Sequence, residues 1–99
     1  MDLYPVVELQ LASLERLVPH LTRHGCDSSA QDAALSLMRY FDDSREAREV
    51  KSLASAYALV RHRLKDIAEG RSGSLPVSNV AIFTRCYREH LLRGERRLD

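Results

Sequence analysis

The chain has 99 residues, a length that fits one domain with a single core and leaves little room for a second domain or a deep internal cavity. Hydrophobic residues make up 44% of it, which excludes a disordered chain, and no apolar run approaches the ~20 residues of a membrane span. Residues 1–44 carry three basic and seven acidic side chains and residues 45–99 carry twelve and seven, an asymmetry that either steers an acidic partner or, as we favour, draws the two halves together.

Two helices are predicted in the first half of the chain. The first covers residues 3–24, with Asp2 as its N-cap and Gly25 as its left-handed end. The second ends at about Asp42, and its start fits a capping box formed by Ser28 and Gln31. Apolar residues recur every three or four positions in both, which predicts one buried stripe on each: Val7, Leu11, Leu14, Val18 and Leu21, then Ala30, Ala34, Leu37 and Phe41.

Two more helices are predicted in the second half. The third is the longest, about residues 45–69, with Asp43 and Glu46 in capping-box register and Gly70 at its end. The fourth begins near Ser74, has Pro76 in its first turn and ends at about residue 93. Their predicted buried stripes are Val50, Leu53, Tyr57, Val60, Leu64 and Ile67, then Val80, Phe83, Tyr87 and Leu91.

This succession of amphipathic helices and short turns predicts an all-α fold with a long third helix. An antiparallel four-helix bundle is the expected architecture, and a helix-rich dimer that completes its core between two chains is the close alternative. Residues 1–94 are expected to form the single helical domain and residues 95–99 a frayed tail. The N-terminal residues lack the pattern of a secretory signal, and two isolated cysteines are typical of free thiols, so we expect a cytoplasmic protein.

Some apolar residues fall outside the predicted stripes. Ile82 and Cys86 lie opposite the buried side of the fourth helix, and Leu59 lies opposite much of the stripe of the third. Isolated apolar residues at a surface are common, but apolar residues rimmed by charge are typical of a protein–protein site. We therefore predict a partner-binding or self-association surface composed of Leu59, Arg63, Ile82, Cys86, Glu89 and Arg93. Arg61, a charge within the apolar arc, is expected to extend to an edge, or to pair with an acidic residue of the first two helices.

Catalytic and metal-binding patterns are weak in this sequence. His20, His24 and Cys26 are residue types that bind zinc, but no fourth ligand is marked and exposed histidines are the simpler interpretation. Cys86 and His90 have the spacing of a thiolate pair without a third orienting residue. The glycines at 70 and 73 fit no nucleotide-binding pattern. We expect no enzyme, no metal and no cofactor.

One segment resembles a DNA-binding motif. Residues 64–69 read Leu-Lys-Asp-Ile-Ala-Glu and are followed by Gly73 and by Val-Ser-Asn-Val at 77–80, which resembles the helix-turn-helix of lac-repressor-type regulators over about 17 residues. The turn is one residue out of register, Pro76 opens the would-be recognition helix, and the preceding helix is too long. The resemblance implies that Ser78, Asn79 and Arg85 face bases or phosphates and that Arg71 contacts the DNA backbone.

Two functions follow as expectations. The first is a small cytoplasmic helical regulator or adaptor, of the antiactivator, chaperone or neutralising-protein type, which binds another protein and occludes it with the third and fourth helices. It is also expected to self-associate, most simply as a homodimer. The alternative is a DNA-binding transcriptional regulator that uses residues 64–93, although the near-zero net charge does not favour strong binding to nucleic acid. No membrane association is expected.

Overall fold

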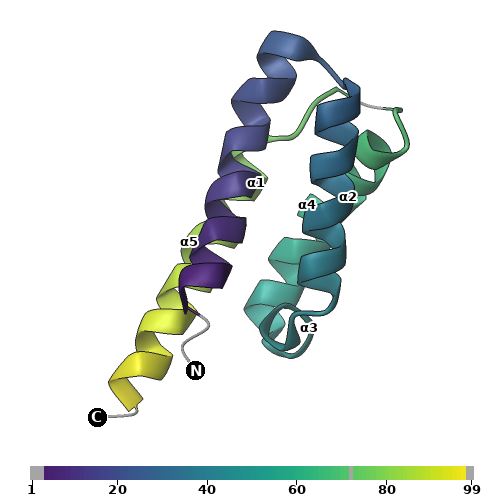
Figure 1. Ribbon diagram of the computed structural model, residues 1–99. Coiled ribbons are helices and arrows are strands. Elements are labelled where there is room, and N and C mark those ends of the chain that lie inside the picture. Colours follow the sequence, from purple (N-terminus) through teal and green to yellow (C-terminus); the bar gives the residue numbers. More distant parts are fainter. Residues whose placement is uncertain (1–3, 72, 98–99) are drawn as a thin grey trace.

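The computed structural model describes residues 4–71 and 73–97, and within these ranges it contains five helices and no strand (Figure 1). The all-α prediction is confirmed. The helices are α1 (Tyr4–His24), α2 (Ser28–Asp42), α3 (Arg45–Glu49), α4 (Lys51–Ala68) and α5 (Val77–Arg97). None of them is both long enough and apolar enough to cross a membrane.

The four longer helices surround one core. Helix α1 packs against α2 and α5, and α4 packs against the same two helices from the other side. Figure 1 shows α1 alongside α5, α2 alongside α4, and the short α3 at one end of α4. The resulting body is elongated, with extents of 44 × 23 × 21 Å.

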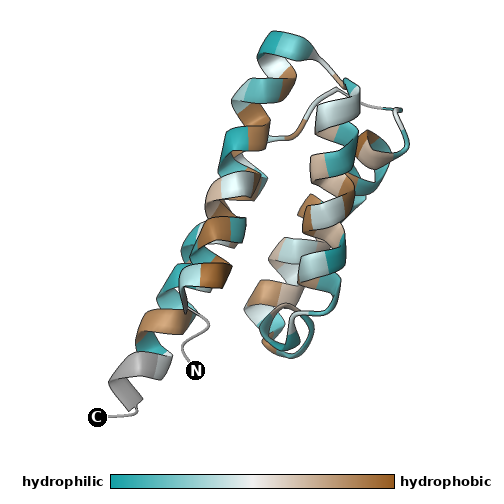
Figure 2. Cartoon of the chain, viewed as in Figure 1, coloured by the Kyte–Doolittle hydropathy of each residue, from teal (hydrophilic) through white to brown (hydrophobic). Residues whose placement is uncertain are grey.

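The buried residues follow the predicted periodicity. Most members of the four predicted stripes are buried, and Val18, Val50 and Leu91 are partly buried against them. Apolar segments accordingly recur between hydrophilic ones along each helix in Figure 2. The sequence prediction missed five further buried residues, namely Leu17, Ala47, Ala56, Leu75 and Thr84.

Aromatic rings fill the centre of the core. Phe41 of α2 is fully buried and lies 5.1 Å from Phe83 of α5, with an edge-to-face arrangement of the two rings. The rings of Tyr57 and Tyr87 lie 5.9 and 6.0 Å from that of Phe41. These side chains come from α2, α4 and α5, so a single cluster ties three helices together.

The predicted long third helix is wrong, because Val50 divides it into α3 and α4. Val50 has an extended backbone (φ −78°, ψ 112°) and is at once the last cap of α3 and the first of α4. At ~100° per residue, an uninterrupted helix would point Ala47 well away from the stripe formed by residues 53–67. The break allows Ala47 to be buried, with 2% of its surface exposed. Apolar spacing continues through Val50, so the sequence pattern gives no sign of the break.

The left-handed end predicted at Gly25 is confirmed, and Gly70, predicted as the end of the third helix, is left-handed as well. Gly25 has φ +70° and donates its N–H to the Leu21 carbonyl at 2.8 Å. Gly70 has φ +75° and donates to the Ile67 carbonyl at 3.0 Å, while the Arg71 N–H reaches the Asp66 carbonyl at 2.8 Å. This pair of hydrogen bonds is the Schellman motif, which satisfies the last carbonyls of α4.

Both predicted capping boxes are wrong by one residue. Asp27, rather than Ser28, caps α2 by accepting the Ala30 N–H at 2.8 Å, because its backbone is extended and Ser28 is already helical. Ser44, rather than Asp43, caps α3 by accepting the Ala47 N–H. The Asp2 cap predicted for α1 lies outside the described residues.

The last helix begins later and ends later than predicted. Its first hydrogen bond runs from the Val80 N–H to the Pro76 carbonyl at 3.2 Å, so Pro76 precedes the first turn instead of lying within it. Gly94 does not end the helix, which continues to Arg97. A Cβ added at Gly94 would meet no atom within 4 Å, so nothing packs closely against the chain at that position. The division into a domain of residues 1–94 and a tail of residues 95–99 stays a prediction.

Candidate partner-binding surface

Six large apolar side chains are exposed in the described parts of the chain, and three of them belong to α5. They are Val6 and Leu9 on α1, Leu59 on α4, and Val77, Ile82 and Leu92 on α5. Leu59 and Ile82, both predicted from the sequence, are 58% and 46% exposed. Two apolar side chains on adjacent helices are the starting point for a contact surface.

Arg61 shows which side of α4 is turned toward α2, because its guanidinium binds Asp42 of α2. The Arg61 Nε and Nη2 atoms lie 2.8 and 3.0 Å from the two oxygens of Asp42. At ~100° per residue, Leu59 and Arg63 lie on the opposite side of α4 from Arg61. These two residues therefore lie on the side of α4 turned away from Asp42 of α2. Arg63 is half-buried there.

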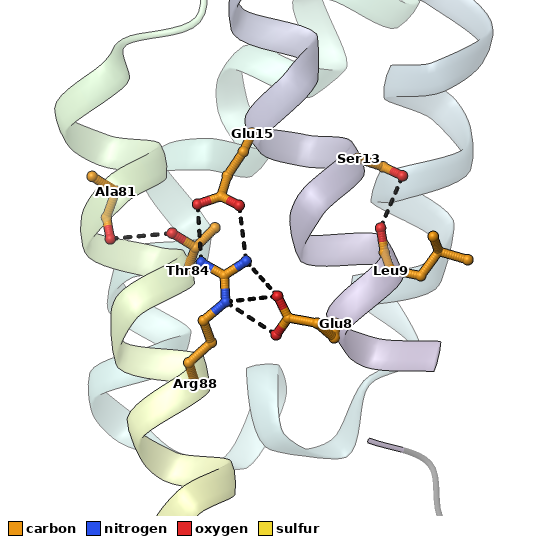
Figure 3. A network of polar contacts seen from close by, with 7 residues as sticks. All are labelled: Glu8, Leu9, Ser13, Glu15, Ala81, Thr84 and Arg88. Carbon is orange, nitrogen blue, oxygen red and sulfur yellow. Dashed lines mark hydrogen bonds and ion pairs between the residues drawn. The ribbon is translucent and has the colours of Figure 1, made fainter. Parts of the chain in front are cut away.

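Arg88 in the same way shows which side of α5 is turned toward α1. It donates to Glu8 at 2.7 Å and to Glu15 at 2.8 Å, both on α1, and Figure 3 shows the guanidinium between the two carboxylates. Cys86 therefore lies on the side of α5 turned away from α1, whereas Ile82 lies nearer the outward side of the helix. Cys86 is half-buried and packs against the core.

The remaining two predicted residues continue the Ile82–Cys86 stripe along α5. Glu89 and Arg93 follow Cys86 at intervals of three and four residues, so they share its side of the helix. Both are exposed, and an Arg93 nitrogen lies 4.0 Å from a Glu89 oxygen. The six predicted residues thus lie on two helices that pack against each other, and we call them together the α4/α5 surface: Leu59, Arg63, Ile82, Cys86, Glu89 and Arg93.

The two ion-pair networks also shift the pKa values of the side chains that form them. Hydrogen bonding to Arg88 lowers the pKa of Glu15, and the pKa of Asp42 is lowered mainly by its hydrogen bond from Arg61. The Tyr57 hydroxyl donates to the same Asp42 carboxylate at 2.7 Å, and burial raises its pKa. Of the two sequence interpretations of Arg61, pairing with an acidic residue is the one the structure shows. Both partners are more than a third exposed, so this pair adds little to the free energy of unfolding.

Arg88 was missed by the sequence prediction. A usable signal was present, because Glu8 and Glu15 are seven residues apart and therefore lie on the same side of α1. Two carboxylates on one side of a helix favour a cationic side chain on the helix that faces them. Which helix faces α1 is decided only by the tertiary structure.

The residues considered for metal binding do not converge. His20 Nε2 lies 3.0 Å from Asp27 Oδ1, and the rings of His20 and His24 are 4.9 Å apart. The Cys26 thiol instead donates to the Ile67 carbonyl at 3.2 Å. Within the described residues no group of three or more His, Cys, Asp or Glu side chains is arranged to hold a metal ion. Cys26 and Cys86 are free thiols.

The segment that resembles a helix-turn-helix has a different connection. Eight residues, 69–76, separate α4 from α5, whereas the DNA-binding motif has a turn of three or four. Ser78 and Arg85 are exposed on α5, and Asn79 is half-buried. Arg71 forms ion pairs with Glu69 and Asp66. The two acidic partners offset its charge and weaken it as a phosphate contact.

Comparison with known proteins finds no matching family model, no similar curated protein and no similar solved structure.

Proposed function

We propose that this chain is a small cytoplasmic helical regulator or adaptor that binds another protein through the α4/α5 surface. Two exposed apolar side chains, Leu59 and Ile82, lie on helices that pack against each other, and Arg63 and Arg93 lie on the same two helices. An apolar centre with arginine at its edge is the usual composition of a protein–protein contact. This is the observation that carries the proposal.

Binding through these residues would act by occlusion. The partner would present an apolar patch with acidic side chains at its margin, and α4 and α5 would cover it. An antiactivator, a chaperone or a neutralising protein works in this way. The proposal includes no catalytic step, no cofactor and no metal. It also retains the antiparallel four-helix bundle as the architecture of the longer helices, with α3 as an addition to it.

Capture from the native host with tagged variants tests the proposal. Leu59→Asp and Ile82→Asp place a charge in the centre of the surface and should abolish capture of a protein that the wild-type chain retains. Leu9→Asp is the matched control, because Leu9 is exposed to the same extent as Leu59, at 58%, but lies on α1. Equal capture by all three variants and the wild type would refute the surface.

DNA binding is the second candidate, favoured by one observation. Arg85 and Ser78 are exposed on α5, and Arg85 forms no ion pair with any described residue. Fluorescence anisotropy with a generic duplex at about 50 and 200 mM salt decides the matter, since phosphate contacts weaken steeply with salt. Tight, salt-sensitive binding that Arg85→Glu removes would support the alternative. No binding at the lower salt concentration would eliminate it.

A further inference from the structure

Helix α5 has an outward side that the other described residues do not cover. Ile82, Arg85, Glu89 and Leu92 are spaced by three, four and three residues, so they form one stripe along the helix. All four are exposed, Ile82 by 46% and Leu92 by 44%. The stripe lies opposite the buried side of α5, which carries Phe83 and Tyr87. We call these four residues the outer stripe.

The two charged residues of the outer stripe have few ion-pair partners among the described residues. Arg88, on another side of α5, binds two glutamates at 2.7 and 2.8 Å, whereas Arg85 has no ion pair among the described residues. The one ion pair of Glu89 in those residues is its 4.0 Å contact with Arg93. The outer stripe thus presents an apolar end, a cation, an anion and a second apolar end, in that order.

This order is complementary to itself when reversed. In two identical antiparallel helices, residues at equal distances on either side of a central position face each other. With the centre at position 87, Ile82 faces Leu92 of the second copy and Arg85 faces its Glu89. A parallel pair would instead place Arg85 against Arg85 and Glu89 against Glu89. Alternating spacings of three and four residues are also those of a coiled-coil seam.

We propose that the outer stripe binds the outer stripe of a second copy of this chain, forming a two-fold symmetric antiparallel dimer. Each copy contributes two apolar and two charged side chains, which form two apolar contacts and two ion pairs in the dimer. The stripe runs from Ile82 to Leu92, or ~15 Å, which is short for a stable interface, so the expected dissociation constant is on the order of micromolar. This self-association does not depend on the proposed partner protein. It covers Ile82 and Glu89 of the α4/α5 surface, so the dimer and the partner complex compete.

Charge reversal provides the test, with sedimentation velocity on the whole chain from about 1 to 200 µM at low salt. The wild type should dimerise within this range. In a dimer of Arg85→Glu, both facing pairs at positions 85 and 89 are glutamate against glutamate. In a dimer of Glu89→Arg, both are arginine against arginine. Each variant alone should dimerise at least about tenfold more weakly than the wild type. Arg39→Glu, which makes the same charge change at an exposed site on α2, should dimerise as the wild type does.

An equimolar mixture of the two variants is the decisive sample. In the mixture every facing pair is again one cation and one anion, so heterodimer should form with a dissociation constant near that of the wild type. Each chain in the mixture still carries its own i,i+4 like-charge pair, so recovery cannot come from repair of the helix. Far-UV circular dichroism checks that both variants fold.

Three results would overturn the proposal. A wild type that is monomeric over the whole concentration range refutes the dimer. Dimerisation that both variants leave unchanged assigns it to another surface. Variants that fold and lose dimerisation, but do not recover it on mixing, refute the antiparallel register. None of these outcomes depends on capture of a partner, so failure here is distinct from failure of the proposed function.

Discussion

The aromatic cluster gives the largest stability prediction for this protein. Phe41 is fully buried, and four other aromatic rings lie within 6.0 Å of its ring: Tyr40, Tyr57, Phe83 and Tyr87. Phe41→Ala removes this contact and leaves a cavity between α2, α4 and α5, which costs ~3–5 kcal/mol. A domain of this length has a free energy of unfolding of about 5–15 kcal/mol. The variant therefore loses a large share of its stability, and its Tm should fall by ~12–40 °C.

Urea denaturation followed by far-UV circular dichroism measures this loss. Phe41→Leu keeps more of the volume and should be destabilised less than Phe41→Ala. Leu9→Ala, at a site 58% exposed, is the control and should change the free energy of unfolding by no more than ~0.5 kcal/mol. If Phe41→Ala stays within ~1 kcal/mol of the wild type with an unchanged denaturant slope, the reasoning that places this ring at the centre of the core is refuted.

Two further predictions concern the helix ends and the α1–α5 ion pairs. Gly70→Ala forces a Cβ into a left-handed backbone (φ +75°) and should lower the free energy of unfolding by ~1–2 kcal/mol. Gly94→Ala, inside α5, should raise it by up to ~1 kcal/mol. Equal stabilities of the two variants in the same denaturant series would contradict both assignments. Arg88→Met should lower the free energy of unfolding by about 1 kcal/mol near neutral pH, because the three side chains are only partly buried. Arg88 holds the pKa of Glu15 below 4.5, so its contribution to stability is present above about pH 4.5 and is lost as the pH falls through the lower folded-state pKa. The Tm values of the variant and the wild type should therefore converge in acid. A constant Tm difference would argue against the Glu15 contact.

The candidate surface could be predicted from the sequence only as two separate stripes. Helical spacing places Ile82, Cys86, Glu89 and Arg93 on one side of α5 and Leu59 with Arg63 on one side of α4. Spacing does not tell which side of α4 meets which side of α5. That relation is fixed by contacts between distant residues, above all by the buried rings of Tyr57 on α4 and Phe83 on α5, whose centroids lie 5.5 Å apart.

The helical class, most of the buried stripes and the glycine ends of two helices could be predicted from the residues alone. Each of these depends on interactions within a few residues, such as the 3.6-residue period or the tolerance of glycine for positive φ at Gly25 and Gly70. The tertiary structure decided the break at Val50, because burial of Ala47 requires a change of direction that local spacing does not encode. It also decided the partner of Arg88, since Glu8 is 80 residues away along the chain and is brought to it only by the packing of α1 on α5.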